Sequence, residues 1–323
     1  MDLSDDSGVS ADLRMYGINK RRKGKVAVFL KQWRIQLMVL PLSIWCIAIF
    51  YVPILGNIIA FQDYKIHKGF LGSKFVGLKH FVNFFTDSDF VQLLRNTMVI
   101  GIMQLAFGTI LAVIFAILLN EIKALSFKRT IQTVSYLPYF VSWAVVANLF
   151  VTLLSDTGPI NGILVSTGIL DEPFLFLSRP ELYWITVTLQ NVWKNIGWNA
   201  IIYIAAIISI PNEMYEAAYV DGATRLQRIL YITLPSIMPT IAVLLIMNSG
   251  QLMQAEFEQQ FLMFNSSVMN VAEIIPTYVY KRGLAGGQFS FATAVGMFQS
   301  VVSITLLVIV NKISRKSAGI SLW

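Results

Sequence analysis

Residues Pro211–Pro239 read PNEMYEAAYVDGATRLQRILYITLPSIMP and lie between two long apolar segments of the chain. Charged side chains cannot remain in the hydrocarbon of a bilayer without a large cost in free energy. This segment carries five of them, Glu213, Glu216, Asp221, Arg225 and Arg228. We therefore predict that residues 211–235 form a polar elbow, held between two membrane spans and lying outside the bilayer.

The elbow contains the sequence signals of two short helices. Pro211 breaks the preceding helix, and Asn212 is expected to cap a helix over Glu213–Asp221. Gly222 tolerates the left-handed backbone conformation in which a helix stops sharply. A second helical stretch, residues 224–231, is expected to lead back to the membrane.

Composition indicates an all-α membrane protein. The 323 residues are 56% hydrophobic and 13% charged, with a mean hydropathy of +0.64, whereas about 25% of residues are charged in soluble domains. Apolar runs recur with the length of about 20 residues that crosses a bilayer as a helix. The net charge of +7 lies mainly in the tails and loops, so it does not indicate nucleic-acid binding. The single cysteine, Cys46, excludes an intrachain disulfide.

Six transmembrane helices are expected, at about residues 35–61, 96–119, 131–154, 182–210, 236–255 and 291–313. They define a membrane domain over residues 35–313, between tails at 1–34 and 314–323. The loop at 155–181 is expected to be mostly irregular, and the loop at 256–290 to contain a short helix, Val271–Arg282, closed by Gly283. Pro235 and Pro239 are expected in the first turns of the fifth span, where proline does least harm.

Lys and Arg indicate the orientation of the chain, because cytoplasmic loops are enriched in both. Six spans place the two termini and the elbow on the same side of the membrane. That side carries 16 of the 25 Lys and Arg residues and the opposite side 8, with Lys194 inside a span. We therefore expect both termini and the elbow to be cytoplasmic.

The fourth span is unusually polar. Its amide, aromatic and charged residues are Gln190, Asn191, Trp193, Lys194, Asn195, Trp198, Asn199 and Tyr203, and other spans add Gln104, Asn248, Gln251 and Gln254. Amides and flat aromatic rings are the groups that bind sugars, so we interpret this set as the lining of a polar substrate pathway. The alternative is that these residues hydrogen-bond neighbouring helices together.

Lys194 is the one ionisable residue near the middle of a predicted span, about sixteen residues before Pro211. A buried cation normally faces a cavity or a partner. Two interpretations stay open: Lys194 could attract the carboxylates of an acidic sugar, or it could pair with Glu256 or Glu258.

Several catalytic and nucleotide-binding motifs do not occur in the sequence. It contains no GxxxxGK[ST] loop, no zinc-type spacing around its two histidines and no GxSxG signature. We therefore expect no catalytic residue, no metal site and no cofactor in this chain, and ATP hydrolysis by a separate subunit.

The elbow resembles the EAA signature of ABC importer permeases. The matching residues are Glu216, Ala217, Ala218, Asp221, Gly222, Ile232, Leu234 and Pro235. This resemblance implies that residues 211–235 contain the coupling helix, which contacts a cytoplasmic ATPase, and that the matching residues contact or shape that joint.

Further stretches resemble the oligosaccharide branch of the maltose-type permeases, which includes the importer of alginate oligosaccharides. They include IIAFQDYK at 58–65, QTVSYLPYF at 132–140 and VWKNIGWNAIIYIAA at 192–206. The resemblance implies a type I ABC importer permease fold in the bacterial inner membrane. It also implies four kinds of partner: a second homologous permease, two ATPase subunits that bind ATP and Mg, a periplasmic or extracellular sugar-binding protein, and an oligosaccharide substrate.

Two other classes of function stay open on the sequence. A membrane enzyme acting on a polysaccharide or a lipid-linked sugar would need paired carboxylates, for which Glu256, Glu258 and Glu273 are loose candidates. A signalling receptor would use the elbow to dock a different cytoplasmic partner. Turnover by the purified chain would favour the enzyme, and the identity of a co-purifying subunit would distinguish receptor from importer.

Overall fold

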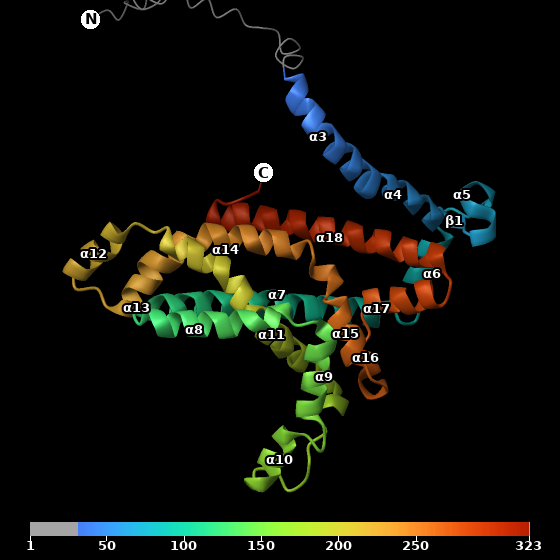
Figure 1. Cartoon of the computed structure of the whole chain (residues 1–323). Helices are drawn as coiled ribbons and strands as arrows, with labels where there is room; N and C mark the ends of the chain where they lie inside the picture. The colour runs from blue at the N-terminus through green and yellow to red at the C-terminus, as the bar shows by residue number, and fades with distance from the viewer. Residues whose placement is uncertain (1–31, 323) are drawn as a thin grey trace, which may run out of the picture. The chain divides into compact units, whose positions relative to one another are not determined.

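The computed structural model describes residues 32–322 of the chain (Figure 1). Almost all of the predicted N-terminal tail therefore lies outside the described residues. The chain divides into two compact units, one that ends at Asn57 and a second that runs from Ile58 to Trp323. Within the described residues five helical segments are long and apolar enough to cross a membrane, and a sixth results if Pro180–Ile208 and Asn212–Val220, bent by 69°, count as one span.

The described part of the first unit belongs to one long helical segment, Trp33–Phe61. It begins as α3 (Trp33–Cys46), passes through a π-helical turn at Ile47–Tyr51 and continues as α4 (Val52–Leu55). The π turn ends two residues before Pro53, whose nitrogen carries no hydrogen for the regular pattern of helical hydrogen bonds. Val52 donates its N–H to the Ile47 carbonyl instead, so the helix passes the proline without stopping.

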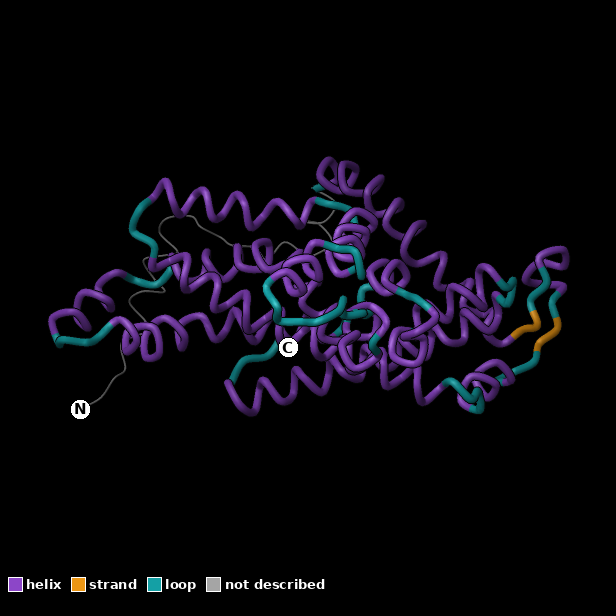
Figure 2. The backbone as a smooth tube through the Cα atoms, turned by 90° about the horizontal axis from the view of Figure 1, so that it is seen from below, coloured by secondary structure: helices purple, strands orange, loops and turns teal. Residues whose placement is uncertain are grey.

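Helices dominate the second unit, in which the described residues contain one pair of short antiparallel strands (Figure 2). The strands β1 (Gln62–Asp63) and β2 (Lys74–Phe75) enclose the short helix α5 (Gly69–Gly72). After α6 (Lys79–Phe85), the long α7 (Phe90–Glu121) packs along α11 (Pro180–Ile208), and α14 (Leu234–Ser249) packs against α18 (Phe289–Ala318). Small residues such as Ala112, Ala116 and Ala200 let α7 and α11 approach closely in the core.

The third predicted span is not one helix. It consists of α8 (Leu125–Tyr136), a 3₁₀ turn at Leu137–Phe140 and α9 (Trp143–Leu154), which leaves at a sharp angle to α8 (Figure 1). Pro138 cannot donate a backbone hydrogen bond, and the chain leaves the helical conformation three residues later, at Val141 (ψ 137°) and Ser142 (ψ 150°). Ser142 then starts α9 by accepting a hydrogen bond from Val145 N–H (3.4 Å). The expectation of a continuous helix over 131–154 was wrong for this reason.

Both long loops contain more helix than the sequence suggested. The loop at 155–181 holds α10 (Pro159–Ser166), stabilised by Asn161, which exchanges hydrogen bonds with the backbone of Phe174. The loop at 256–290 holds α15 (Phe257–Met263), α16 (Met269–Ala272) and α17 (Ile275–Val279), and then a π-helical turn at Tyr280–Ala285. Gly283 lies inside that turn and does not close a helix. The residue there is glycine because a Cβ would approach the Ala292 Cβ of α18 to 2.3 Å.

An ionic cluster ties the turn before α7 to α17. The Asp87 carboxylate accepts hydrogen bonds from the Tyr278 hydroxyl (2.6 Å) and from Arg282 (2.6 Å), and also from the N–H of Asp89 (3.0 Å). Burial alone would raise the pKa of Asp87, but the hydrogen bonds from Tyr278 and Asp89 and the charge of Arg282 together lower it. The ionised form is therefore the form that stabilises the fold.

This cluster gives a pH-dependent stability. A carboxylate with a lowered pKa stabilises the folded state above its unfolded value of about 4, and that contribution is lost as the pH falls through the folded value. Arg282 is half exposed, so we expect Asp87→Asn to cost only about 1 kcal/mol at pH 7 and to flatten the acid limb of the stability curve. Thermal unfolding of the purified protein at pH 7 and pH 3 measures this. Asp156→Asn, at an exposed carboxylate outside the cluster, is the control, and an equal effect of both substitutions would contradict the assignment.

Candidate functional site

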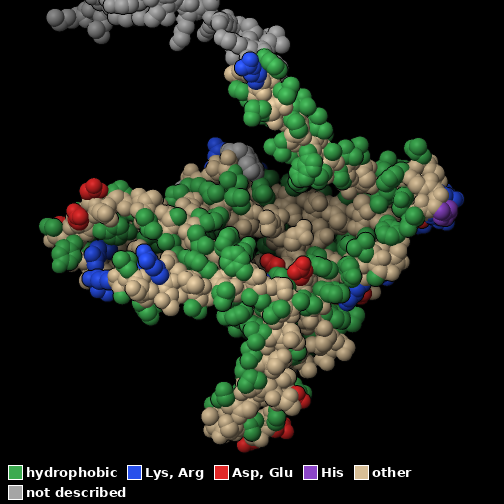
Figure 3. All heavy atoms as spheres, viewed as in Figure 1, with side chains coloured by type: hydrophobic (Ala, Val, Ile, Leu, Met, Phe, Trp, Pro, Cys, Tyr) green, Lys and Arg blue, Asp and Glu red, His purple; other side chains and the backbone are tan. Residues whose placement is uncertain are grey.

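The elbow forms one end of the second unit, where acidic and basic side chains gather (Figures 1 and 3). Its first helix is α12 (Asn212–Val220). Pro211 holds the N-cap position, so Asn212 is the first helical residue and not the cap that we expected. The stop at Gly222 is confirmed: its φ is +77°, its N–H donates to the Tyr219 carbonyl, and Ala223 N–H reaches back to the Ala218 carbonyl.

The return from the elbow is a single helical rod. Thr224 and Gln227 form a capping box at the start of α13 (Arg225–Arg228), and a π-helical turn at Ile229–Thr233 joins α13 to α14. The segment Arg225–Ser249 is therefore continuous. Pro235 and Pro239 lie in the first turns of α14, as expected, but α14 continues the helical rod and does not begin a separate helix. The π turn precedes Pro235, which has no N–H to donate.

The residues of the EAA pattern divide into an exposed and an anchored group. Glu216, Ala217 and Asp221 are exposed, as is Pro235, whereas Ile232 and Leu234 pack against the core cluster of α7, α11 and α14. Ala218 and Gly222 line a shallow pocket of about 300 Å³ on the elbow. The Tyr215 hydroxyl bonds Thr233 (2.9 Å), which ties α12 to the return helix. The exposed residues thus sit on a projection that is tied to the return helix.

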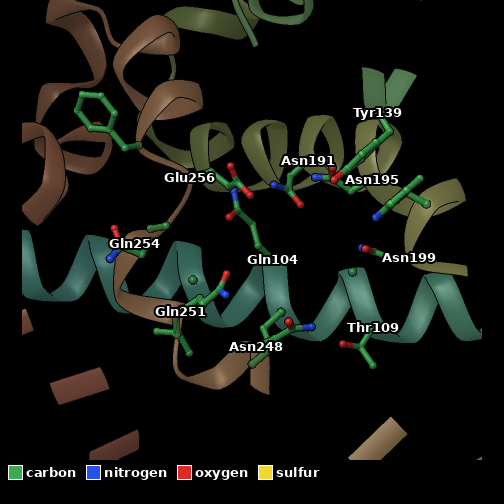
Figure 4. Close-up of a pocket in the computed structure, with 17 residues that line it drawn as sticks. Gln104, Thr109, Tyr139, Asn191, Asn195, Asn199, Asn248, Gln251, Gln254 and Glu256 are labelled. Atoms are coloured by element: carbon green, nitrogen blue, oxygen red, sulfur yellow. The ribbon is translucent and has the colours of Figure 1, made fainter. Parts of the chain in front are cut away.

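A polar cavity of about 650 Å³ lies between α7, α11 and the segment that follows α14 (Figure 4). Its polar lining comes from four different parts of the chain, and Figure 4 shows the amides of Gln104, Asn191, Asn195 and Asn199 extending into the space between α7 and α11. The polar residues are Gln104, Thr109, Tyr139, Asn191, Asn195, Asn199, Asn248, Gln251, Gln254 and Glu256. Trp198 also lines it, with its ring stacked on Tyr139 at a centroid distance of 4.4 Å and an interplanar angle of 3°.

Six of the ten residues that we predicted for the substrate pathway line this cavity: Asn191, Asn195, Trp198, Asn199, Asn248 and Gln251. Within residues 32–322, the side-chain amides of Asn195, Asn199 and Asn248 are not hydrogen-bonded to another residue. They are therefore available to a ligand, and the alternative of helix-to-helix hydrogen bonding does not describe them.

The other four predicted residues lie outside the cavity lining. Gln190 is fully buried and accepts a hydrogen bond from Gln259 (2.7 Å), in a chain of amides that continues to Gln104 (2.8 Å from Gln259). Tyr203 is buried in the core cluster. The ring of Trp193 makes an edge-to-face contact with the ring of Phe150, with 5.7 Å between the ring centroids. For Gln190 the alternative of interhelical hydrogen bonding is the correct one.

Lys194 also does not line the cavity. It is 6% exposed, and its ammonium group donates to three backbone carbonyls at the break between α8 and α9. The ion pairs among the described residues are Lys281–Glu273 and Arg282–Asp87, so Lys194 forms no direct ion pair with Glu256 or Glu258, although both carboxylates lie near enough to interact with its charge. Its use as a direct contact for sugar carboxylates also lacks support, because the group points at the protein backbone.

Sequence reasoning missed Thr109 and Tyr139 and did not place Glu256 in the cavity. Tyr139 follows Pro138, and a proline in the middle of an apolar run is the one signal that could have suggested a break there. Glu256 and Ala255 both have left-handed φ angles, of 50° and 40°, although neither is glycine. Such conformations cost about 1 kcal/mol or more each and concentrate at functional sites. Glu256 is the one carboxylate in the described lining of the cavity.

Known proteins resemble the chain over most of its length. The family described as the binding-protein-dependent transport system inner membrane component matches residues 106–318. The polygalacturonan/rhamnogalacturonan transport system permease protein YteP of Bacillus subtilis (strain 168) is 42% identical over 298 residues, covering 92% of each chain. Protein LplB of the same organism is 42% identical over 282 residues, covering 87% of this chain and 88% of LplB.

A solved structure of an ABC transporter is also similar to this chain. A crystal structure of a bacterial alginate ABC transporter, in complex with a periplasmic protein that carries an alginate pentasaccharide, matches with a TM-score of 0.82 at 36% identity, covering 90% of this chain and 97% of that one. The type I ABC permease fold is therefore confirmed, and the proposals of a membrane enzyme and of a receptor are set aside. The chain belongs to the family of binding-protein-dependent transport system inner membrane components and is the permease subunit of a sugar ABC importer.

Proposed function

We propose that this permease imports oligosaccharides derived from an acidic polysaccharide, such as oligogalacturonates or alginate oligomers. The observation that carries the proposal is the cavity, in which unpaired amides from α11 and α14 face the stacked rings of Tyr139 and Trp198. Amide N–H groups donate to hydroxyl and carboxylate oxygens alike, and aromatic faces cover the apolar face of a sugar ring. Two relatives named for polygalacturonan and alginate transport support the acidic class.

The charge of the cavity restricts how an acidic sugar would lie in it. The described lining contains one carboxylate, Glu256, and no Lys or Arg. A uronate carboxylate is therefore expected to point toward the amides or toward the second permease, and sugar hydroxyls toward Glu256. In this arrangement the present chain recognises hydroxyl groups and ring faces, and contributes no cation.

The elbow is the proposed contact site for an ATPase subunit. Exposed Glu216, Ala217 and Asp221 would contact one of two cytoplasmic ATPase subunits, which bind ATP and Mg, while Ile232 and Leu234 hold the elbow to the spans. A second homologous permease and an external sugar-binding protein complete the importer. The chain would reside in the bacterial inner membrane with both termini in the cytoplasm, and ATP binding would switch the spans between outward-open and inward-open states.

Uptake by the reconstituted importer tests the substrate class. Proteoliposomes that contain both permeases, the ATPases and the binding protein are given ATP and labelled oligogalacturonate, alginate oligomer or a neutral maltooligosaccharide of equal length. We expect uptake of an acidic oligomer and an approximately tenfold loss for Asn195→Leu or Asn199→Leu, because each removes an amide from the cavity. Trp193→Leu, on the same helix but outside the cavity, should stay within about twofold of wild type. Uptake of the neutral sugar alone would refute the acidic class.

A further inference from the structure

The break in the third span places an aromatic pair on the cavity wall. α8 ends at Tyr136, and a 3₁₀ turn at Leu137–Phe140 follows it. Within this turn the ring of Tyr139 stacks on the ring of Trp198 of α11. A broken helix exposes carbonyl groups that have lost their hydrogen-bond donors, and in a membrane each of these costs several kcal/mol unless another group satisfies it. The position of Tyr139 therefore depends on what satisfies the break.

Lys194 supplies the donors that the carbonyls of Tyr139 and Val141 lack, and it adds a second, longer hydrogen bond to the Pro138 carbonyl, which also accepts from Val141 N–H (3.1 Å). Its Nζ atom lies 2.8 Å from the Tyr139 carbonyl oxygen, 2.7 Å from that of Val141 and 3.3 Å from that of Pro138. An ammonium group has three N–H donors, so all three are used. The same Nζ atom lies 5.6 Å from the ring centroid of Tyr139 and 5.3 Å from that of Trp143, within the range of a cation–π contact.

Gly197 brings the two segments close enough for this contact. A Cβ at position 197 would lie 2.1 Å from the Ser135 carbonyl oxygen, so the backbones of α8 and α11 touch at this point. Gly197 is one helical turn beyond Lys194 and one residue before Trp198. The contact therefore fixes α8 against the part of α11 that carries both the lysine and the second ring of the pair.

We propose that Lys194 is a positioning residue, whose ammonium group clamps the carbonyls of Pro138, Tyr139 and Val141 and thereby holds Tyr139 against Trp198 at the cavity wall. The charge of Lys194 acts on the protein backbone and not on the sugar. The consequence for transport rests on the proposed function, whereas the clamp itself is a property of this chain alone. The two can therefore be tested separately.

Hydrogen exchange tests the clamp without a sugar. In the assembled importer, we expect Lys194→Met to accelerate amide exchange in the peptide that covers residues 137–142 by about tenfold or more, because the break loses its donors. Trp193→Leu should leave this peptide unchanged. Asp156→Asn, at an exposed carboxylate away from the break, should also leave it unchanged. Unchanged exchange in Lys194→Met, or equal acceleration in Asp156→Asn, would overturn the clamp whatever the substrate.

The ratio of sugar taken up to ATP hydrolysed tests the consequence. We expect Lys194→Met and Tyr139→Leu each to lower this ratio about fivefold with ATP hydrolysis within twofold of wild type, because the aromatic wall is lost but the elbow is intact. The double variant should be no worse than either single one. Tyr139→Leu keeps the Lys194 ammonium and its three backbone carbonyl acceptors, so it stays informative if Lys194→Met does not assemble. Additive losses, or a parallel fall in uptake and hydrolysis, would refute the positioning role, whereas no uptake by the wild type would refute the proposed substrate only.

Discussion

Gly222→Pro is expected to abolish capture of the ATPase subunits while the permease still inserts into the membrane. Proline fixes φ near −65°, and Gly222 has a φ of +77°, so the stop of α12 cannot form. Proline also removes the N–H that bonds the Tyr219 carbonyl (3.1 Å). The helix would then run on or unwind, and exposed Glu216 and Asp221 would lose their fixed positions. We expect at least about a tenfold loss of co-purifying ATPase, a cost of more than 1.4 kcal/mol.

Gly168 provides a matched control for this experiment. It follows α10 with a φ of +70° and donates its N–H to the Val165 carbonyl (3.0 Å), and a Cβ added there would meet no other atom within 4 Å, as at Gly222. Gly168→Pro therefore causes the same local damage at a different place. The expected result is normal ATPase capture by Gly168→Pro and loss by Gly222→Pro and, more weakly, by Glu216→Ala. Equal capture by all three variants would mean that the elbow is not the joint.

Among additions of one methyl group in the cavity region, Gly197→Ala is expected to cause the largest loss of stability. The added Cβ would lie 2.1 Å from the Ser135 carbonyl oxygen and 2.5 Å from its carbon, and backbone atoms cannot rotate away as a side chain can. Overpacking in a tight core costs about 1–3 kcal/mol. We expect a fall of about 5 °C or more in the unfolding midpoint and a loss of sugar uptake, since α8 must move away from α11.

Gly108→Ala is the control for this substitution. Gly108 lies in α7 and lines the same cavity, but a Cβ there meets nothing within 4 Å. Its unfolding midpoint should not fall and should rise by about 2 °C at most, because alanine favours the helix more than glycine does. An equal loss of stability at both positions would show that the contact between Gly197 and Ser135 does not hold the two helices together.

Sequence patterns predicted features whose cause is local. The apolar runs, the stop at Gly222 and the spacing that puts Asn191, Asn195 and Trp198 on one face of a helix all depend on residues within a few positions of one another. The structure places these three side chains along one cavity.

Features that depend on distant partners were not predictable in this way. Lys194 donates to carbonyls 53 to 56 positions earlier in the chain. Every residue has a backbone carbonyl, so the sequence does not indicate which of them accept from the lysine. Gln190 and Asn191 are adjacent and chemically alike, yet one is held by Gln259 and the other lines the cavity, because the partner comes from a loop helix. The left-handed Ala255 and Glu256 likewise give no signal, since glycine is the residue expected there.

The continuous segment Arg225–Ser249 has a mechanical consequence. Its 25 residues make a lever about 37 Å long, with the elbow at one end and Asn248 near the other. A tilt of about 5° pivoting at the elbow would sweep the far tip through about 3 Å, the length of one hydrogen bond. A tilt of that size, driven from the elbow, is enough to make or break the proposed contact of Asn248 with a sugar hydroxyl.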